Sequence, residues 1–128
     1  MNRLFALCLL VLASPFAMAT AVRADCARPN CWGAIAINTN TQAWAWVVNH
    51  PNAQVAQQLA LTRCNDKCNR VLTFRNSCAA YALAANRGWG WSQGYRDRGG
   101  AEARALDECN RYNPGQGCQV RVWACTSR

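Results

Sequence analysis

The stretch GWGWSQGY at residues 88–95 decides how this chain folds, because a second version of it, AWAWVVNH, occurs at residues 43–50. In both segments two tryptophans stand two positions apart; they are Trp44, Trp46, Trp89 and Trp91. Residues two apart on a β-strand share a face, so each tryptophan pair points one way. The tryptophan pairs either lie on paired strands and pack into one core, or they form an aromatic platform for a ligand.

The sequence around these segments repeats one plan. In the half that spans about residues 31–76, two strand-like segments precede an alanine-rich helical segment and a third strand-like segment; the half at about 78–125 has the same order. The matching segments are 32–38, 43–49, 51–65 and 68–74, and then 78–84, 88–95, 99–111 and 118–125. This pattern predicts an α+β fold, a small disulfide-stapled domain with a mostly antiparallel sheet, two helices and an internal strand-strand-helix-strand duplication.

The two predicted helices carry mostly small side chains on their apolar faces. Pro51 fits the first turn of the first helix. The apolar positions are Val55, Ala56, Leu59 and Ala60, and then Ala101, Ala105, Leu106 and Cys109. Because a well-filled interior sets large groups against small ones, we expect most of the six tryptophans to fill the core. Trp32 or Trp123 is the exception that we expect to serve as a platform.

The amino-terminal residues 1–24 have the pattern of a secretory signal peptide. Arg3 precedes an apolar run at residues 4–12, and small residues follow it. The run is too short to span a membrane, and cleavage after Ala19 or after Ala24 fits the sequence. We expect residues 25–128 to form one periplasmic or secreted domain without a transmembrane segment.

Eight cysteines remain after removal of the signal peptide, and an even number in a small exported chain indicates disulfide bonds. A zinc site at Cys64 and Cys68 is the less favoured alternative, since His50 is the only histidine. The predicted pairs are Cys26–Cys31, Cys64–Cys68, Cys78–Cys125 and Cys109–Cys118. Two of them would tie a helix end to the next strand, and Cys78–Cys125 would join equivalent strands of the two halves. We expect no metal and no cofactor.

The charge balance is basic, with 14 Lys and Arg against 6 Asp and Glu. The arginines are spread singly and do not form a basic run interleaved with aromatic residues, so we expect no nucleic-acid partner. Scattered arginines suit the acidic face of another protein.

The layout is similar to that of a known family, the bacterial exported domain-of-unknown-function 4189 family. The runs that carry the resemblance are WGAIAI, WAW followed by ALTRCN, LTFRNSCAAYA, GWGW, ARALDEC and GCQVRVWAC. The resemblance covers essentially the whole chain from Cys31 and implies secretion, disulfide bonds and a small single domain. It brings no established catalytic residues.

No catalytic motif accompanies these features. The six acidic residues form no convincing pair, and His50, beside Pro51, is interpreted as a residue that leads into the helix. We therefore expect an exported non-enzymatic binding protein, with an inhibitor or immunity-type role against a secreted or periplasmic partner as the most concrete version. The candidate contact residues are Tyr95, Arg96, Arg98 and Arg75. The alternatives are a cell-envelope glycan binder that uses exposed tryptophans, or a secreted factor that acts on a host cell; the sequence leaves the oligomeric state open.

Overall fold

The computed structural model describes residue 26 and residues 30–65 and 67–127. The predicted signal peptide and both of its cleavage sites lie outside these described residues. The helices and strands follow one another as β1 (Trp32–Ile37), β2 (Trp44–His50), α1 (Ala53–Arg63), β3 (Arg70–Arg75), β4 (Cys78–Leu83), β5 (Trp89–Tyr95), α2 (Arg98–Tyr112) and β6 (Gln119–Cys125).

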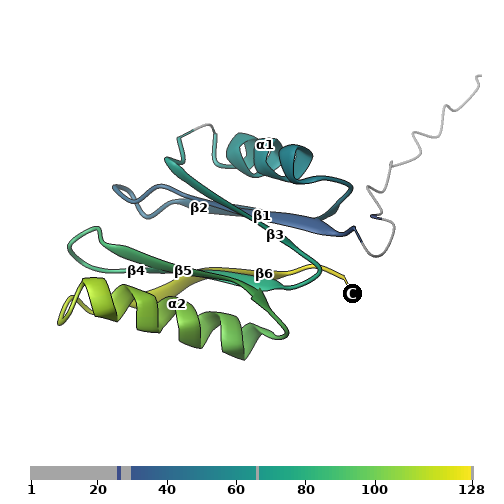
Figure 1. The fold of residues 1–128 in the computed structure, drawn as a ribbon. Coiled ribbons are helices and arrows are strands. Elements are labelled where there is room, and N and C mark those ends of the chain that lie inside the picture. Colours follow the sequence, from purple (N-terminus) through teal and green to yellow (C-terminus); the bar gives the residue numbers. More distant parts are fainter. Residues whose placement is uncertain (1–25, 27–29, 66, 128) are drawn as a thin grey trace, which may run out of the picture.

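These elements form a sandwich of four layers (Figure 1). One antiparallel sheet has the strand order β2-β1-β3 and the other has the order β5-β4-β6. The sheets pack face to face, with α1 on the outer side of the first and α2 on the outer side of the second (Figure 1). The predicted strand-strand-helix-strand duplication is therefore confirmed, and each repeat builds its own sheet and its own helix. The repeat pattern did not specify this division of the strands into two sheets.

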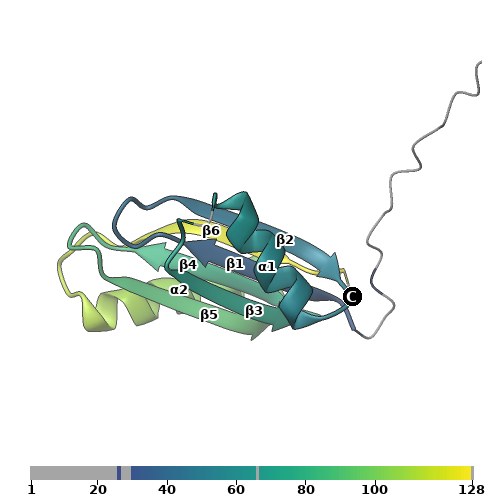
Figure 2. The same cartoon turned by 90° about the horizontal axis from the view of Figure 1, so that it is seen from above.

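The edges of the two sheets lie over each other. Seen from above, β2 and β6 run along one long edge of the sandwich, while β3 and β5 run along the opposite edge (Figure 2). All four of these strands pair with a neighbour on one side only, because β1 and β4 are the central strands.

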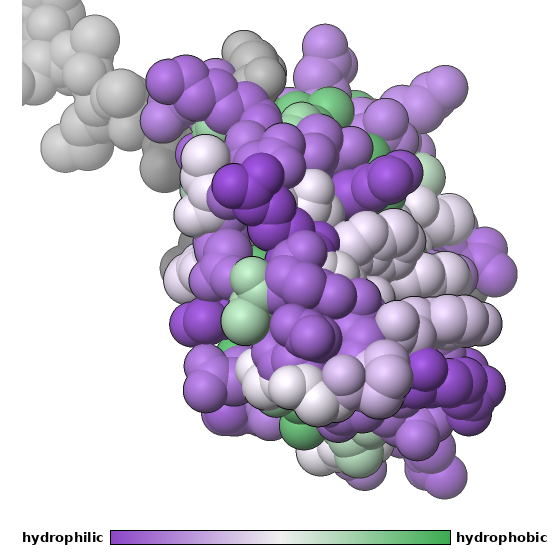
Figure 3. Space-filling view, turned by 90° about the vertical axis from the view of Figure 1, so that its left-hand side faces the viewer, coloured by the Kyte–Doolittle hydropathy of each residue, from purple (hydrophilic) through white to green (hydrophobic). Residues whose placement is uncertain are grey.

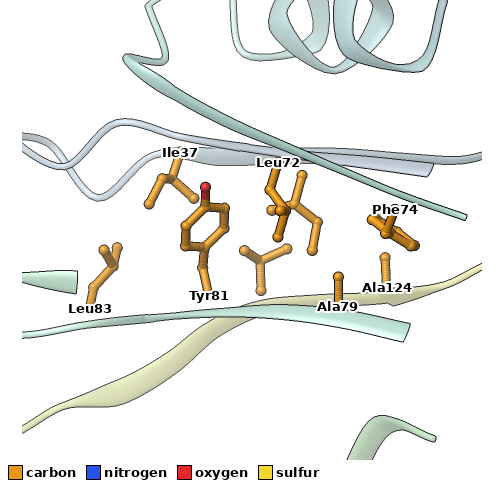
Figure 4. Packing of buried hydrophobic residues seen from close by; sticks show 9 residues of the cluster. Ile37, Leu72, Phe74, Ala79, Tyr81, Leu83 and Ala124 are labelled. Atoms are coloured by element: carbon orange, nitrogen blue, oxygen red, sulfur yellow. The ribbon is translucent and has the colours of Figure 1, made fainter. Parts of the chain in front are cut away.

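The main hydrophobic core lies between the two sheets (Figure 4). Its residues are Ile35, Ile37, Leu72 and Phe74 from the first sheet, and Ala79, Tyr81, Leu83, Val122 and Ala124 from the second. Tyr81 points from β4 toward the opposite sheet (Figure 4). Burial raises the pKa of its phenol to about 12, and the nearby Arg70 opposes this shift. The central strands β1 and β4 and the edge strands β3 and β6 therefore all supply side chains that fill the space between the sheets.

Small residues line the contacts between each helix and its sheet. The buried side chains of α1 are Ala56 and Ala60, and those of α2 are Ala101, Ala105 and Cys109. A side chain at Gly90 of β5 would overlap the α2 backbone at Ala105 and Cys109. The helices can lie this close only because their partners are equally small. Val55 and Leu59, predicted to belong to the apolar stripe of α1, are instead exposed, since Ala56, Ala60 and Leu61 make the contact with the sheet.

The helix starts repeat from one half to the other. The Asn52 side chain accepts a hydrogen bond of 2.9 Å from the Val55 N–H, and Asp97 accepts one of 2.7 Å from the Gly100 N–H. Both are N-caps, which satisfy donors that the first helical turn leaves unpaired. Pro51 was predicted within the first turn, but it precedes the N-cap and so lies outside the helix.

The eight described cysteines form the same four disulfides that the sequence analysis proposes: Cys26–Cys31, Cys64–Cys68, Cys78–Cys125 and Cys109–Cys118. The expectation that Cys78–Cys125 joins equivalent strands of the two halves is wrong, because both residues belong to the second sheet and face each other in β4 and β6. The corresponding positions of β1 and β3 hold Trp32 and Arg75, whose guanidinium carbon lies 5.5 Å from the ring centroid. A cation–π contact thus takes the place of a disulfide in the first half.

The close approach of α2 to β5 gives a direct test of the fold. We expect Gly90→Ala to lower the free energy of unfolding by about 1–3 kcal/mol, because the new methyl group meets backbone that cannot rotate away. Gly99→Ala, in the first turn of α2, is the matched control, since a Cβ there meets only the Asp97 carboxylate at 3.6 Å. Urea unfolding of both variants measures the difference. Equal stability of the two variants would contradict the close helix–sheet contact.

Candidate functional site

Most of the tryptophans are not core residues, so the prediction that they fill the interior is wrong. The exposed fractions are 48% for Trp44, 41% for Trp46, 37% for Trp91 and 38% for Trp123. The Trp-x-Trp pairs do point to the inner faces of the sheets, since Trp46 lies opposite Ile35 and Trp91 opposite Tyr81. They stand on the edge strands β2 and β5, however, and residues of β1, β3, β4 and β6 already fill the core. The rings therefore extend past the core toward solvent.

One edge of the sandwich carries a concave surface with a volume of about 490 Å³, which we call the β2–β6 groove. Its lining residues are Trp44, Trp46, Val48, Arg121, Val122, Trp123, Ala124 and Cys125. They come from the two superposed edge strands, which run side by side in Figure 2. The volume falls in the range of about 300–1,000 Å³ typical of ligand sites.

A pair of side-chain hydrogen bonds joins the two walls of the groove near one end. The Asn49 amide donates a hydrogen bond of 2.9 Å to the Ser127 hydroxyl, and the Ser127 N–H donates one of 2.8 Å to the Asn49 side-chain oxygen. Asn49 occupies a β-bulge position with a φ of 64°, a conformation that asparagine tolerates better than most residues. These bonds connect β2 to the residues that follow β6, so the two strands are held at a fixed separation.

Three arginines belong to the groove lining or contact one of its residues. Arg121 belongs to its lining and is the extra residue of a bulge in β6, where Val120 and Val122 face successive residues of β4. The Arg98 guanidinium carbon lies 4.2 Å from the ring centroid of Trp123. Arg63 of α1 donates a hydrogen bond of 3.0 Å to the carbonyl oxygen of Trp46. The aromatic surface therefore has a positive border.

The described carboxylates gather elsewhere, on α2 and its N-cap. Glu102 pairs with Arg98, Asp107 with Arg104 and Arg111, and Glu108 with Arg104, while Asp97 caps the helix. The end of the sandwich that carries the β1–β2 and β4–β5 hairpins is mostly hydrophilic, with only small separate hydrophobic areas and a band of pale side chains along one flank (Figure 3). That end therefore presents no continuous hydrophobic surface.

Residues 32–125 match the family described as Domain of unknown function (DUF4189). The chain belongs to this family. The match begins at the first residue of β1 and ends at the last residue of β6, so it includes every strand of the sandwich and both walls of the groove.

The DUF4189 fold also has a counterpart among solved structures. The NMR structure of Rv1813c from Mycobacterium tuberculosis is similar, with a TM-score of 0.57 and 25% sequence identity, over 97% of this chain and 99% of that chain. A comparison with curated proteins finds no significant match. Within the part of the chain that the structure describes, neither helix of the DUF4189 domain has the length and apolar character needed to cross a membrane.

The predicted contact residues of the DUF4189 domain are only partly brought together. Arg98 borders the groove through Trp123, whereas Arg75 stacks on Trp32 at the β1–β3 pair. Arg96 is exposed in the turn between β5 and α2, and Tyr95 is half-buried against the start of α2. Trp44, Trp46 and Arg121 were not among the predicted contact residues. The signal that would have found the tryptophans is their place on strands with one neighbour, which the repeat alone does not reveal.

A buried histidine lies on the same strand as the groove tryptophans. His50 ends β2 and is 9% exposed, and the described residues provide no hydrogen-bond partner for its Nδ1. Burial lowers its pKa below the usual value of 6.5, and the positive charge of Arg63 lowers it further. His50 is therefore neutral in the folded DUF4189 domain near neutral pH. Its burial at the end of β2 indicates a structural role.

The lowered pKa of His50 predicts a pH dependence of stability. As the pH falls through 6.5, the unfolded chain binds a proton that the folded domain does not bind, so the free energy of unfolding decreases until the folded-state pKa is reached. We expect the His50→Gln variant to lose this component, since the chain has no other histidine. Urea unfolding at about pH 7.5 and about pH 5 measures it. An identical change in both proteins would show that His50 does not titrate in this way.

Exposure of the tryptophans predicts a contrast between two aromatic substitutions. Phe74 is 2% exposed, so Phe74→Ala should cost about 3–5 kcal/mol of stability. Trp46→Ala removes a ring that is 41% exposed and should cost about 1–2 kcal/mol. Thermal and urea unfolding of the two variants decide the matter. If Trp46→Ala lowers the free energy of unfolding as much as Phe74→Ala does, Trp46 is a core residue and its exposure is wrong.

Proposed function

We propose that this DUF4189 domain is an exported, non-enzymatic binding protein that docks to another protein through the β2–β6 groove. The observation that carries the proposal is the set of Trp44, Trp46 and Trp123 exposed around one cavity beside Arg121. Tryptophan and arginine are the residues most enriched at the energetic centres of protein interfaces. Monomeric proteins expose large apolar side chains in such groups mainly where they bind something.

The chemistry of the lining favours a protein over a neutral glycan. Arg121 is the one charged side chain among the described lining residues, and the remainder are tryptophan, valine, alanine and a disulfide-bonded cysteine. A sugar needs several polar groups to bind its hydroxyls in a fixed orientation. An apolar surface with a single cation instead suits a hydrophobic side chain next to a carboxylate.

The described carboxylates and His50 have structural places in the fold, which supports a role in binding over catalysis. The carboxylates of α2 pair with arginines or cap the helix, and His50 is buried at the end of a strand. A general acid or base must reach a substrate, and these groups are directed into the domain or into ion pairs.

The rigidity of the scaffold supports the inhibitor or immunity-type version of this role. Disulfides brace the end of α1, the end of α2 and the β4–β6 pair, and the Asn49–Ser127 contact holds the groove walls together. A surface that is ordered before binding loses little conformational entropy on docking. Four disulfides are also typical of proteins that work in oxidising compartments, the periplasm or the cell exterior.

A cell-envelope glycan is the second candidate ligand, and one observation favours it. Trp44 and Trp46 lie on the same face of β2 and are both more than two-fifths exposed, an arrangement in which two rings can stack on consecutive sugars.

An affinity capture experiment with the mature, oxidised protein separates the two ligands. We expect wild type to recover a discrete protein from periplasmic or secreted extracts, and Trp46→Ala to lower recovery at least tenfold, as for residues at interface centres. Arg111→Glu is the control, since Arg111 lies on α2 and pairs with Asp107. Sedimentation with peptidoglycan is measured in parallel. Co-sedimentation that Trp46→Ala abolishes, without a protein partner, would replace the protein-binding proposal with the glycan one.

A further inference from the structure

The β2–β6 groove has features that specify which part of a protein it can bind. We infer that it binds an acidic segment that carries a large apolar side chain, and that it holds this segment through side chains, without adding it to a sheet as a strand. This inference rests on the proposed function and specifies the chemistry of the partner.

The charge of the groove border sets the first requirement. Among the described residues, Arg121 has no carboxylate within ion-pair distance, and it is an exposed residue of the groove lining. Arg98 forms an ion pair with Glu102, but its side chain remains more than half exposed where it stacks on Trp123. A carboxylate on the partner would pair with Arg121 beside an apolar surface, where water screens the attraction less than on open surface.

The apolar walls of the groove set the second requirement. Trp44 and Trp46 form one wall, while Val122 and Ala124, which belong to the main core, form part of the other. A large aliphatic or aromatic side chain placed between them would remove apolar surface from water on both sides. A purely acidic segment would leave this surface uncovered.

The backbone of both edge strands argues against strand addition. An added strand needs a regular row of free N–H and C=O groups on the edge. On β2 the Trp46 carbonyl already accepts a hydrogen bond from Arg63, and the bulge at Asn49 ends the regular row. On β6 the bulge at Arg121 interrupts the row in the middle of the strand. Bulges and edge cations are the usual means by which proteins prevent edge pairing.

The chain itself offers no segment of this kind. The residues around Cys26 at the start of the mature chain contain Arg23 and Arg28 against Asp25, so they are not acidic. A second copy of the chain would offer the carboxylates of α2, but these already pair with arginines of the same helix. Both copies would also carry the same excess of positive charge. The occupant is therefore a segment of a different protein.

Titration with synthetic peptides tests the inference directly. The probe is a capped heptapeptide with a central leucine flanked by three glutamates on each side. The comparison peptides replace glutamate with lysine, replace leucine with alanine, or carry N-methyl groups on alternate backbone nitrogens. The side-chain N–H signals of the tryptophans in the mature, ¹⁵N-labelled protein report binding.

We expect the glutamate–leucine peptide to shift the Trp44 and Trp46 signals and to bind at least tenfold more tightly than the lysine peptide, with the difference shrinking in high salt. The alanine peptide should bind more weakly, and the N-methylated peptide should bind as well as its parent. Arg121→Glu should abolish the preference for glutamate, whereas Arg111→Glu should preserve it. Arg121→Gln gives a second variant in case the reversed charge disturbs folding, and it should weaken the same preference.

Each contrary result overturns one part of the inference or the proposed function. Equal binding of the glutamate and lysine peptides, or an unchanged preference in both Arg121 variants, overturns the acidic partner. A tenfold loss on N-methylation overturns the side-chain mode, because it would show that backbone pairing holds the segment. If Trp46-dependent capture of a protein persists while the peptide preference is absent, the inference fails and the proposed function stands. If the peptide preference is present but no protein is captured, the proposed function fails.

Discussion

The close contact between each helix and its sheet is the constraint on which the rest of the structure depends. Alanines, a serine and Gly90 line these contacts, and the Ser92 hydroxyl donates a hydrogen bond of 2.6 Å to the Ala101 carbonyl within one of them. Such surfaces leave little room for large side chains, which pack mainly at their margins, as Trp32 and Tyr95 do. Most of the large buried side chains of the strands therefore point to the opposite face, into the space between the sheets, where the two repeats bury a shared core.

The shared core has room for the large side chains of the central strands but not for all those of the edge strands. On the β3–β5 edge, Trp89 packs against Tyr81 and under Arg70, whose guanidinium carbon lies 5.2 Å from the ring centroid. Trp44 is the equivalent of Trp89 in the first repeat, since they face Ile37 and Leu83 in their ladders. The position equivalent to Arg70 is Gln119, which supplies no cation to stack on a ring. Duplication thus produced two similar edges: on one, an arginine of the opposite sheet stacks on Trp89, and on the other, tryptophans without such a cover line the groove.

The repeat, the order of the elements and the cysteine pairs could be predicted from the sequence, because they follow from local periodicity and from matching residues along the chain. The exposure of Trp44 and Trp46 could not. Alternation shows which side chains share a face of a strand, but exposure depends on whether a second strand flanks that strand, which is a property of the sheet. Arg121 was missed for a related reason, since a one-residue bulge in β6 leaves no distinctive sequence pattern. The candidate site therefore depends on which strands lie at the sheet edges, whereas the order of the elements depends on residue types along the chain.

Collisional quenching of the intrinsic tryptophan fluorescence by acrylamide tests the central claim, that small helix–sheet contacts leave tryptophans at the edges of the sandwich exposed in the folded protein. Trp44, Trp46, Trp91 and Trp123 are all more than one-third exposed, so the folded, oxidised wild type should be quenched efficiently. Trp44→Phe and Trp46→Phe should each remove a strongly quenched component, and Trp89→Phe a protected one, since Trp89 packs against the core. Weak quenching of the folded protein, restored only by urea, would contradict the account, because it would place these rings inside the domain.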